Sequence, residues 1–163
     1  MAVSQVVIFS LLALVGISSF LVMIGMYQKT EQVYDHALSV YRGLLLDAAQ
    51  TSIHIMKVSV SAASLYVTVG NNGSVSLYQF PKFAVVVEYY ANISGVAALS
   101  LSLYVYTAGT PSAYQWTSAT GELFSGRSAT FLIGLPYPPY ALSQATVVIA
   151  TNFGPEAVWS GTV

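Results

Sequence analysis

The hydrophobic pattern changes twice along the chain. Residues 6–27 are apolar apart from three serines and the glycines, and no charged side chain precedes Lys29. About 20 apolar residues, at about 1.5 Å each, span a hydrocarbon core of about 30 Å, so the pattern predicts a transmembrane helix within residues 1–28. A cleaved secretory signal is the alternative, but this apolar run is too long and ends without an A-x-A-like pair of small residues.

A helical period continues beyond the predicted membrane span. Six residues between 30 and 50 recur mostly at three- and four-residue steps and form one apolar stripe: Val33, Ala37, Val40, Tyr41, Leu44 and Ala48. No proline interrupts the segment, so we expect a helical stalk over residues 29–51. Such a stripe has to be buried on its own domain or on a neighbouring helix, which favours self-association or assembly with a second anchored protein.

At about Thr51 the period changes from 3.6 to 2, which is typical of β-strands. The clearest alternation sets four apolar residues from Leu99 to Val105 against serines and tyrosines. The sequence Asn71-Asn72-Gly73 predicts a tight hairpin turn. Residues 108–126 are expected to form a long loop. About seven or eight short strands are expected, around 58–60, 65–69, 75–78, 83–90, 99–106, 128–133, 144–151 and 156–162.

These patterns predict a mainly β chain with an N-terminal α-helix. We expect residues 52–163 to form an immunoglobulin-like antiparallel β-sandwich outside the membrane. One strand departs from the usual pattern, because residues 83–90 are apolar on both faces. One interpretation is that the 108–126 loop covers this strand. The other is a contact between two copies of the chain, centred on Val86 and including Ala84 and Glu88.

The amino-acid composition excludes several classes of protein. The 163 residues include only 5 Lys+Arg and 6 Asp+Glu, so charged residues make up 7%, against about 25% in an average soluble domain. The mean hydropathy is +0.66. An ordinary cytosolic enzyme surface and a disordered chain are therefore excluded, and five basic residues are too few to bind nucleic acid. Without cysteine there is no disulfide framework and no thiolate zinc site.

Short sequence features indicate on which side of the membrane the C-terminal domain lies. Lys29 favours the C-terminal side inside. Two glycosylation sequons, Asn72-Gly73-Ser74 and Asn92-Ile93-Ser94, favour the outside, and we expect the domain there. A surface of hydroxyls keeps its polarity in acid, where carboxylates lose their charge. We therefore expect an acidic exterior.

No catalytic, metal or cofactor constellation is found. His36 and His54 stand apart from any ligand spacing, and Glu88, Glu122 and Glu156 show no spacing typical of paired catalytic carboxylates. No G-x-S-x-G motif or phosphate-binding glycine loop occurs. We predict no enzyme activity and no cofactor. Aromatic residues reach 13%; the set Tyr104, Tyr106, Tyr114, Trp116, Tyr137 and Tyr140 belongs either to the core or to a recognition surface.

Three segments carry a family resemblance: the apolar helix 6–27, the strand and turn segment 65–90, and the late strand 145–161. Together they resemble archaeal type IV filament proteins, and most of all the FlaF and FlaG accessory proteins of the archaellum. Archaeal pilins and archaellins usually have a basic leader before a Gly or Ala cleavage point. Here Lys and Arg are absent before residue 29, which favours a retained, anchored accessory protein over a filament subunit.

The resemblance to FlaF implies a stator that binds the S-layer protein from beneath and forms a homodimer through the sandwich. It implies FlaG-like or other archaellum subunits as further partners, and the membrane as anchor. The alternatives are a FlaG-like accessory protein and a pilin that packs residues 3–50 in a filament core. An anchored carbohydrate-binding or enzymatic domain is a third hypothesis.

Overall fold

A computed structural model describes residues 2–163. Helix α1 (Ala2–Gln50) runs without a break through both predicted helical segments. Its hydroxyls bond back to the preceding turn: Ser10 donates to the Val6 carbonyl at 2.8 Å and Ser18 to the Leu14 carbonyl at 2.8 Å. In the described chain, one helix is long and apolar enough to cross a membrane. The division of α1 into a membrane segment and a stalk stays a prediction.

Residues 45–163 form one compact unit. Its strands are β1 (Ile53–Ser61), β2 (Ser64–Asn71), β3 (Ala84–Ile93), β4 (Val96–Tyr106), β5 (Gln115–Ser118), β6 (Ser128–Gly134), β7 (Gln144–Ala150) and β8 (Glu156–Thr162). One short 3-10 helix, η1 (Phe80–Lys82), begins beside Pro81. The mainly β class with an N-terminal helix is therefore confirmed.

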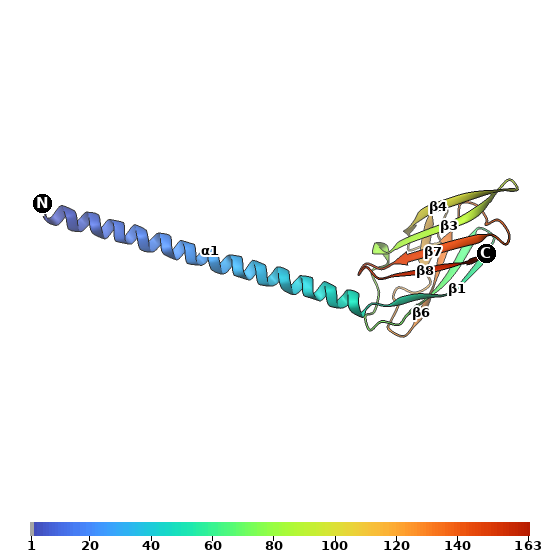
Figure 1. Cartoon of the computed structure of the whole chain (residues 1–163), viewed down its shortest axis with the longest axis horizontal. Helices are drawn as coiled ribbons and strands as arrows, with labels where there is room; N and C mark the ends of the chain where they lie inside the picture. Colours follow the sequence, from blue (N-terminus) through green and yellow to red (C-terminus); the bar gives the residue numbers. More distant parts are fainter. Residues whose placement is uncertain (1) are drawn as a thin grey trace. The chain divides into compact units, whose positions relative to one another are not determined.

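The strands follow the order β1-β2-β6-β5-β4-β3-β7-β8. The two ends of this order, β1 and β8, are in contact, so the sheet folds over into two layers. We call β1, β2, β6 and β5 layer one, and β4, β3, β7 and β8 layer two. Figure 1 shows the layer-two strands side by side. All pairings are antiparallel except the short one of β4 with β5, where Val105 pairs with Gln115 and Tyr106 with Trp116.

The core lies between the layers and is centred on aromatic rings. The ring of Trp116 lies 4.8 Å from that of Phe131, and the ring of Phe80 lies 5.5 Å from that of Phe131. Trp116 and Phe131 are fully buried. These contacts hold β5 in place although it has only four residues. The expected loop over residues 108–126 therefore contains a strand, and that part of the prediction is wrong.

Two further local predictions are wrong. Residues 71–73 are not a hairpin turn, because after Asn71 the chain crosses from layer one to η1 and β3. The first hairpin instead turns at Ala62 and Ala63, where Ala62 has a φ of 53°. The expected strand at 75–78 is reduced to a single bridge between Leu77 and Leu123.

Asn71 explains why the segment after β2 folds as it does. Its Nδ2 donates to the Val75 carbonyl at 2.8 Å and to the Leu123 carbonyl at 3.2 Å. Its Oδ1 accepts from the Gly73 N–H at 3.0 Å. The side chain is 1% exposed. One buried amide therefore joins three backbone groups at the end of the sandwich where α1 enters.

Candidate functional site

The alternating residues of β4 point in an unexpected direction. Leu99, Leu101 and Leu103 are 59%, 64% and 59% exposed, whereas Tyr104 is buried. Ser100 and Ser102 are half-buried and face the core side. The leucines therefore lie on the outer face of layer two, where an antiparallel sheet exposed to water usually carries polar residues.

The apolar character crosses the whole of layer two. Val86 on β3 pairs with Leu103 on β4 and with Val148 on β7. Val148 in turn pairs with Val158 on β8, which is 58% exposed. One row of apolar side chains thus spans four strands. We call the following set the apolar face: Ala84, Val86, Leu99, Leu101, Leu103, Val105, Val148 and Val158.

Polar groups border this row. Glu88 is exposed and pairs with Leu101 and Thr146. The hydroxyl of Thr146 lies 3.0 Å from that of Ser160 on the neighbouring strand. An apolar row next to a single carboxylate and two hydroxyls has the composition of an interaction surface with an apolar centre and a polar edge.

The outer face of layer one is different. Thr68 on β2 lies opposite Thr130 on β6, with their hydroxyls 3.5 Å apart. Tyr66 presents 39% of its surface on the same side. The two outer faces of the sandwich therefore differ in chemistry: among the described strands, a continuous apolar row crosses layer two and not layer one.

The structure brings the predicted contact residues together. Val86 is half-buried, and Ala84 and Glu88 are exposed on the same face of β3. The 108–126 segment does not cover them, because its strand β5 pairs with β4 and β6 and leaves Leu101 64% exposed. The covering interpretation is therefore wrong. Contact between copies stays a prediction, and sequence patterning missed the four exposed apolar residues of β4 as part of the same surface.

The residues considered for chemistry are spread over the fold. In the part of the chain that the structure describes, no group of three His, Cys, Asp or Glu side chains is close enough to hold a metal. Glu88 on β3, Glu122 in the loop between β5 and β6, and Glu156 at the start of β8 are exposed and lie apart in the fold. The His54 ring packs over Gly70, where a Cβ atom would lie 2.4 Å from His54 Cε1. His54 Nδ1 is buried and has no hydrogen-bond partner among residues 2–163. His36 lies on α1.

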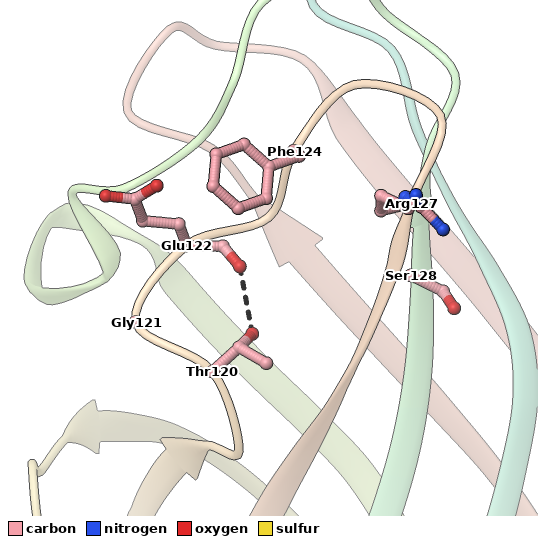
Figure 2. Close-up of a pocket in the computed structure, with 6 residues that line it drawn as sticks. All are labelled: Thr120, Gly121, Glu122, Phe124, Arg127 and Ser128. Carbon is pink, nitrogen blue, oxygen red and sulfur yellow. Dashed lines mark hydrogen bonds between the residues drawn. The ribbon is translucent and has the colours of Figure 1, made fainter.

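One open hollow of about 550 Å³ lies beside the loop between β5 and β6. It is lined by Thr120, Gly121, Glu122, Phe124, Arg127 and Ser128. Figure 2 shows the Glu122 carboxylate pointing away from the Arg127 guanidinium. The Thr120 hydroxyl donates to the Glu122 backbone carbonyl at 2.9 Å. The hollow thus has no converging pair of acid and base.

The aromatic residues divide between core and surface. Trp116 and Tyr104 are buried, whereas Tyr114, Tyr137 and Tyr140 are 47%, 44% and 40% exposed. Burial raises the pKa of the Tyr104 hydroxyl well above its ordinary value. This hydroxyl has no hydrogen-bond partner in the described residues. Burial also raises the pKa of Tyr89, whose hydroxyl donates to the Tyr137 carbonyl at 3.0 Å.

The sandwich matches a known family over most of its length. The model of the conserved flagellar protein F immunoglobulin-like domain matches residues 49–161. The chain belongs to this family. The match covers nearly the whole β-sandwich, so the chain is a FlaF family member, that is, a protein of the archaeal flagellum family of conserved F proteins. No curated protein sequence matches the chain.

Solved structures share the fold of this FlaF family member. It is similar to the archaellum periplasmic stator protein FlaG from Sulfolobus acidocaldarius, with 18% identity, a TM-score of 0.54, and coverage of 68% of this chain and 99% of that one. It is similar to a chain of the FlaF and FlaG stator complex from the same organism, with 17% identity, a TM-score of 0.54, and coverage of 67% and 87%.

A third similar structure includes the helix. The archaeal flagellum of Methanospirillum hungatei strain JF1 aligns with 13% identity and a TM-score of 0.55, covering 98% of this chain and 91% of that one. At these identities the likeness establishes the fold alone. The alignment shows that a long N-terminal helix followed by a β-sandwich is shared between this chain and a chain of that flagellum.

Proposed function

We propose that this FlaF family member is a membrane-anchored stator component of an archaellum. The N-terminal part of α1 crosses the membrane, and the sandwich lies outside, beneath the S-layer, and binds the S-layer protein. Family membership and the helix of membrane-spanning length support this proposal. A membrane helix alone diffuses laterally, whereas a domain that is also bound to a rigid surface lattice resists the torque of a rotating filament.

The observation that carries the assembly part of the proposal is the apolar face. Leu101, Leu103 and Val158 are each more than half exposed. Burial of apolar surface contributes about 25 cal/mol per Å², and exposed apolar patches on a sheet mark interaction sites. We propose that two copies pack these faces against each other, with Val86 near the centre and Ala84 and Glu88 beside it.

Val86→Lys tests this dimer. A lysine at the centre of the contact would bury an unpaired charge in each copy, which costs several kcal/mol. We expect at least a tenfold weaker association in analytical ultracentrifugation of fragment 45–163. Thr68→Lys, on the outer face of layer one, is the matched control and should leave association unchanged. A Val86→Lys protein that associates as strongly as the parent would overturn the dimer contact.

Other archaellum subunits are proposed as further partners, because a stator complex of FlaF with FlaG is among the similar structures. The same apolar face would then be shared between copies of this chain and a FlaG-like protein. Mixing fragment 45–163 with a FlaG-like domain should give a complex of defined mass, and Val86→Lys should weaken it if the same face is used.

A filament subunit is the second candidate, because the archaeal flagellum structure aligns over 98% of this chain. In a filament, residues 3–50 would pack in a helical core. Electron microscopy of the full chain after detergent removal separates the two functions. The stator proposal predicts discrete particles, and regular filaments formed by this chain alone would favour the filament subunit.

A further inference from the structure

The two glycosylation sequons lie at opposite ends of the sandwich. Asn72 follows the end of β2, and its N–H donates to the Ser52 carbonyl at 2.8 Å, where α1 enters. The Asn92 N–H donates to the Pro138 carbonyl at 2.8 Å. The Pro138 loop lies at the other end, because Leu135 donates to the Ala63 carbonyl in the β1–β2 turn at 2.8 Å.

Asn92 is held inside a tight hairpin. Its side-chain Oδ1 accepts a hydrogen bond from the Gly95 N–H at 2.9 Å, across a turn in which Ser94 has a φ of 54°. The residue is half-buried on the same side of β3 as Val86 and pairs with Ala97. Its amide oxygen is therefore held by the turn, and any group attached to Nδ2 would lie at the end of the apolar face.

The surroundings of Asn72 differ from those of Asn92. The residue is exposed, it lies outside the strands, and its side chain makes no hydrogen bond within the described residues. The backbone around it is well held, since Gly73 donates to the Ser52 carbonyl at 3.1 Å and Ser74 to the Gln50 carbonyl at 2.9 Å. The Asn72 side chain borders a shallow hollow of about 160 Å³ that also touches Met56 and Arg127.

The fold explains why Asn71 and Gly73 occupy their positions in this loop, but it gives no such reason for Asn72 and Ser74. Asn71 bonds three backbone groups. Gly73 is needed because a Cβ atom there would lie 2.3 Å from the Gln50 carbonyl oxygen. Asn72 and Ser74 are exposed and make no side-chain contribution of this kind. They are the two residues that define the sequon.

We propose that Asn72 carries an N-linked oligosaccharide and that Asn92 does not. The proposal rests on the external placement proposed above. Asn72 Nδ2 attacks the anomeric carbon of a lipid-linked oligosaccharide and forms the N–C bond. The bond from that carbon to the phosphate oxygen breaks, and the lipid phosphate leaves with the electron pair while the amide loses one proton. The sugar then covers the end of the sandwich at α1 and leaves the apolar face free for protein contacts.

Trypsin separates the two sequons for mass spectrometry. It cleaves after Lys57, Lys82 and Arg127, so Asn72 lies in the peptide 58–82 and Asn92 in the peptide 83–127. The full chain is produced in an archaeal host that glycosylates its own surface proteins, whose glycopeptides serve as the positive control. We expect the oligosaccharide mass on most copies of peptide 58–82 and its absence from peptide 83–127.

Variants of the two sequons identify the modified residue. Asn72→Gln and Ser74→Ala should each remove the added mass, and Ser74→Thr should keep it. Asn92→Gln should leave the glycan mass unchanged. An unmodified peptide 58–82, or a modified peptide 83–127, would overturn the proposal.

Protease accessibility distinguishes this inference from the proposed function. In whole cells with a permeable S-layer, cleavage of the domain by added protease shows that it lies outside. An external domain with an unmodified Asn72 overturns the glycan alone. A protected, unmodified domain overturns both the glycan and the external placement.

Discussion

Replacing Asn71 tests how the sandwich holds its end beside α1. Asn71→Ala removes both hydrogen bonds donated by Nδ2, to the Val75 and Leu123 carbonyls, and the bond accepted from the Gly73 N–H. Each such hydrogen bond contributes about 1 kcal/mol net. The side chain is 1% exposed, so water does not readily replace the lost partners. We therefore expect the free energy of unfolding to fall by about 3 kcal/mol.

This loss is large for a domain of this size, since single domains are stable by about 5–15 kcal/mol. It corresponds to a lowering of the melting temperature by roughly 12 °C, at about 4 °C per kcal/mol. The assay is equilibrium unfolding of fragment 45–163 in urea, followed by tryptophan fluorescence, because Trp116 lies in the core.

Asn72→Ala is the matched control, because it removes a neighbouring exposed amide from the same loop. Its free energy of unfolding should stay within about 0.5 kcal/mol of the parent. An Asn71→Ala protein that loses less than about 1 kcal/mol, with an unchanged denaturant slope, would refute the role given to Asn71.

Four further predictions address the core and the pH range. Tyr104→Phe should raise the free energy of unfolding by about 1 kcal/mol, because it removes a buried hydroxyl that has no hydrogen-bond partner in the described part of the chain. Burial raises the pKa of Tyr104 in the folded state. The contribution of Tyr104 to the free energy of unfolding should therefore be complete below about pH 10 and fall above it, because there this hydroxyl ionises in the unfolded chain and stays neutral in the folded one. Tyr104→Phe should reduce this fall. Gly134→Ala should cost about 1–3 kcal/mol, because its Cβ would lie 2.2 Å from the Ser112 carbonyl oxygen, whereas Gly109→Ala meets nothing within 4 Å and should be neutral. Between pH 7 and pH 3 the domain should lose less than about 1 kcal/mol, because hydroxyls such as those of Thr68, Thr130 and Thr146 supply polar groups on its outer faces and carry no charge to lose in acid; a loss of several kcal/mol, measured by urea unfolding at pH 3, would contradict this.

The two-residue period located most strands, because alternation records which side chains face a layer. It could not say which side of β4 faces the core. The leucine face of a strand would ordinarily be expected to face the core. In β4, however, Leu101 and Leu103 face outward and Ser100 and Ser102 face the core. The choice depends on what layer one presents to β4, and this is long-range information that a single strand does not contain.

The missed and misplaced elements have the same cause. Strand β5 is four residues long and is held by the packing of Trp116 against Phe131 and by pairing with β4 and β6. The segment 70–73 has the residues of a hairpin turn, but Asn71 bonds distant backbone groups instead. The real hairpin turn at Ala62 and Ala63 has neither glycine nor asparagine. In each case tertiary contacts outweigh local preference.

The predicted contact was centred on one strand, whereas the apolar row to which Val86 belongs spans four strands. The apolar pattern of residues 83–90 indicated Val86 as its centre, and Leu103, Val148 and Val158 lie in the same row. Pairing between strands far apart in sequence assembles this row, so no local pattern could reveal its extent.

Binding to the S-layer is the central claim and can be measured directly. Isolated S-layer sheets are mixed with fragment 45–163 at pH 3 and pH 7 and then sedimented, with an unrelated β-sandwich of similar size as control. The stator proposal predicts that the fragment sediments with the sheets in a saturable manner at the pH of the cell exterior. A fragment that stays in the supernatant with the control protein at both pH values would contradict it.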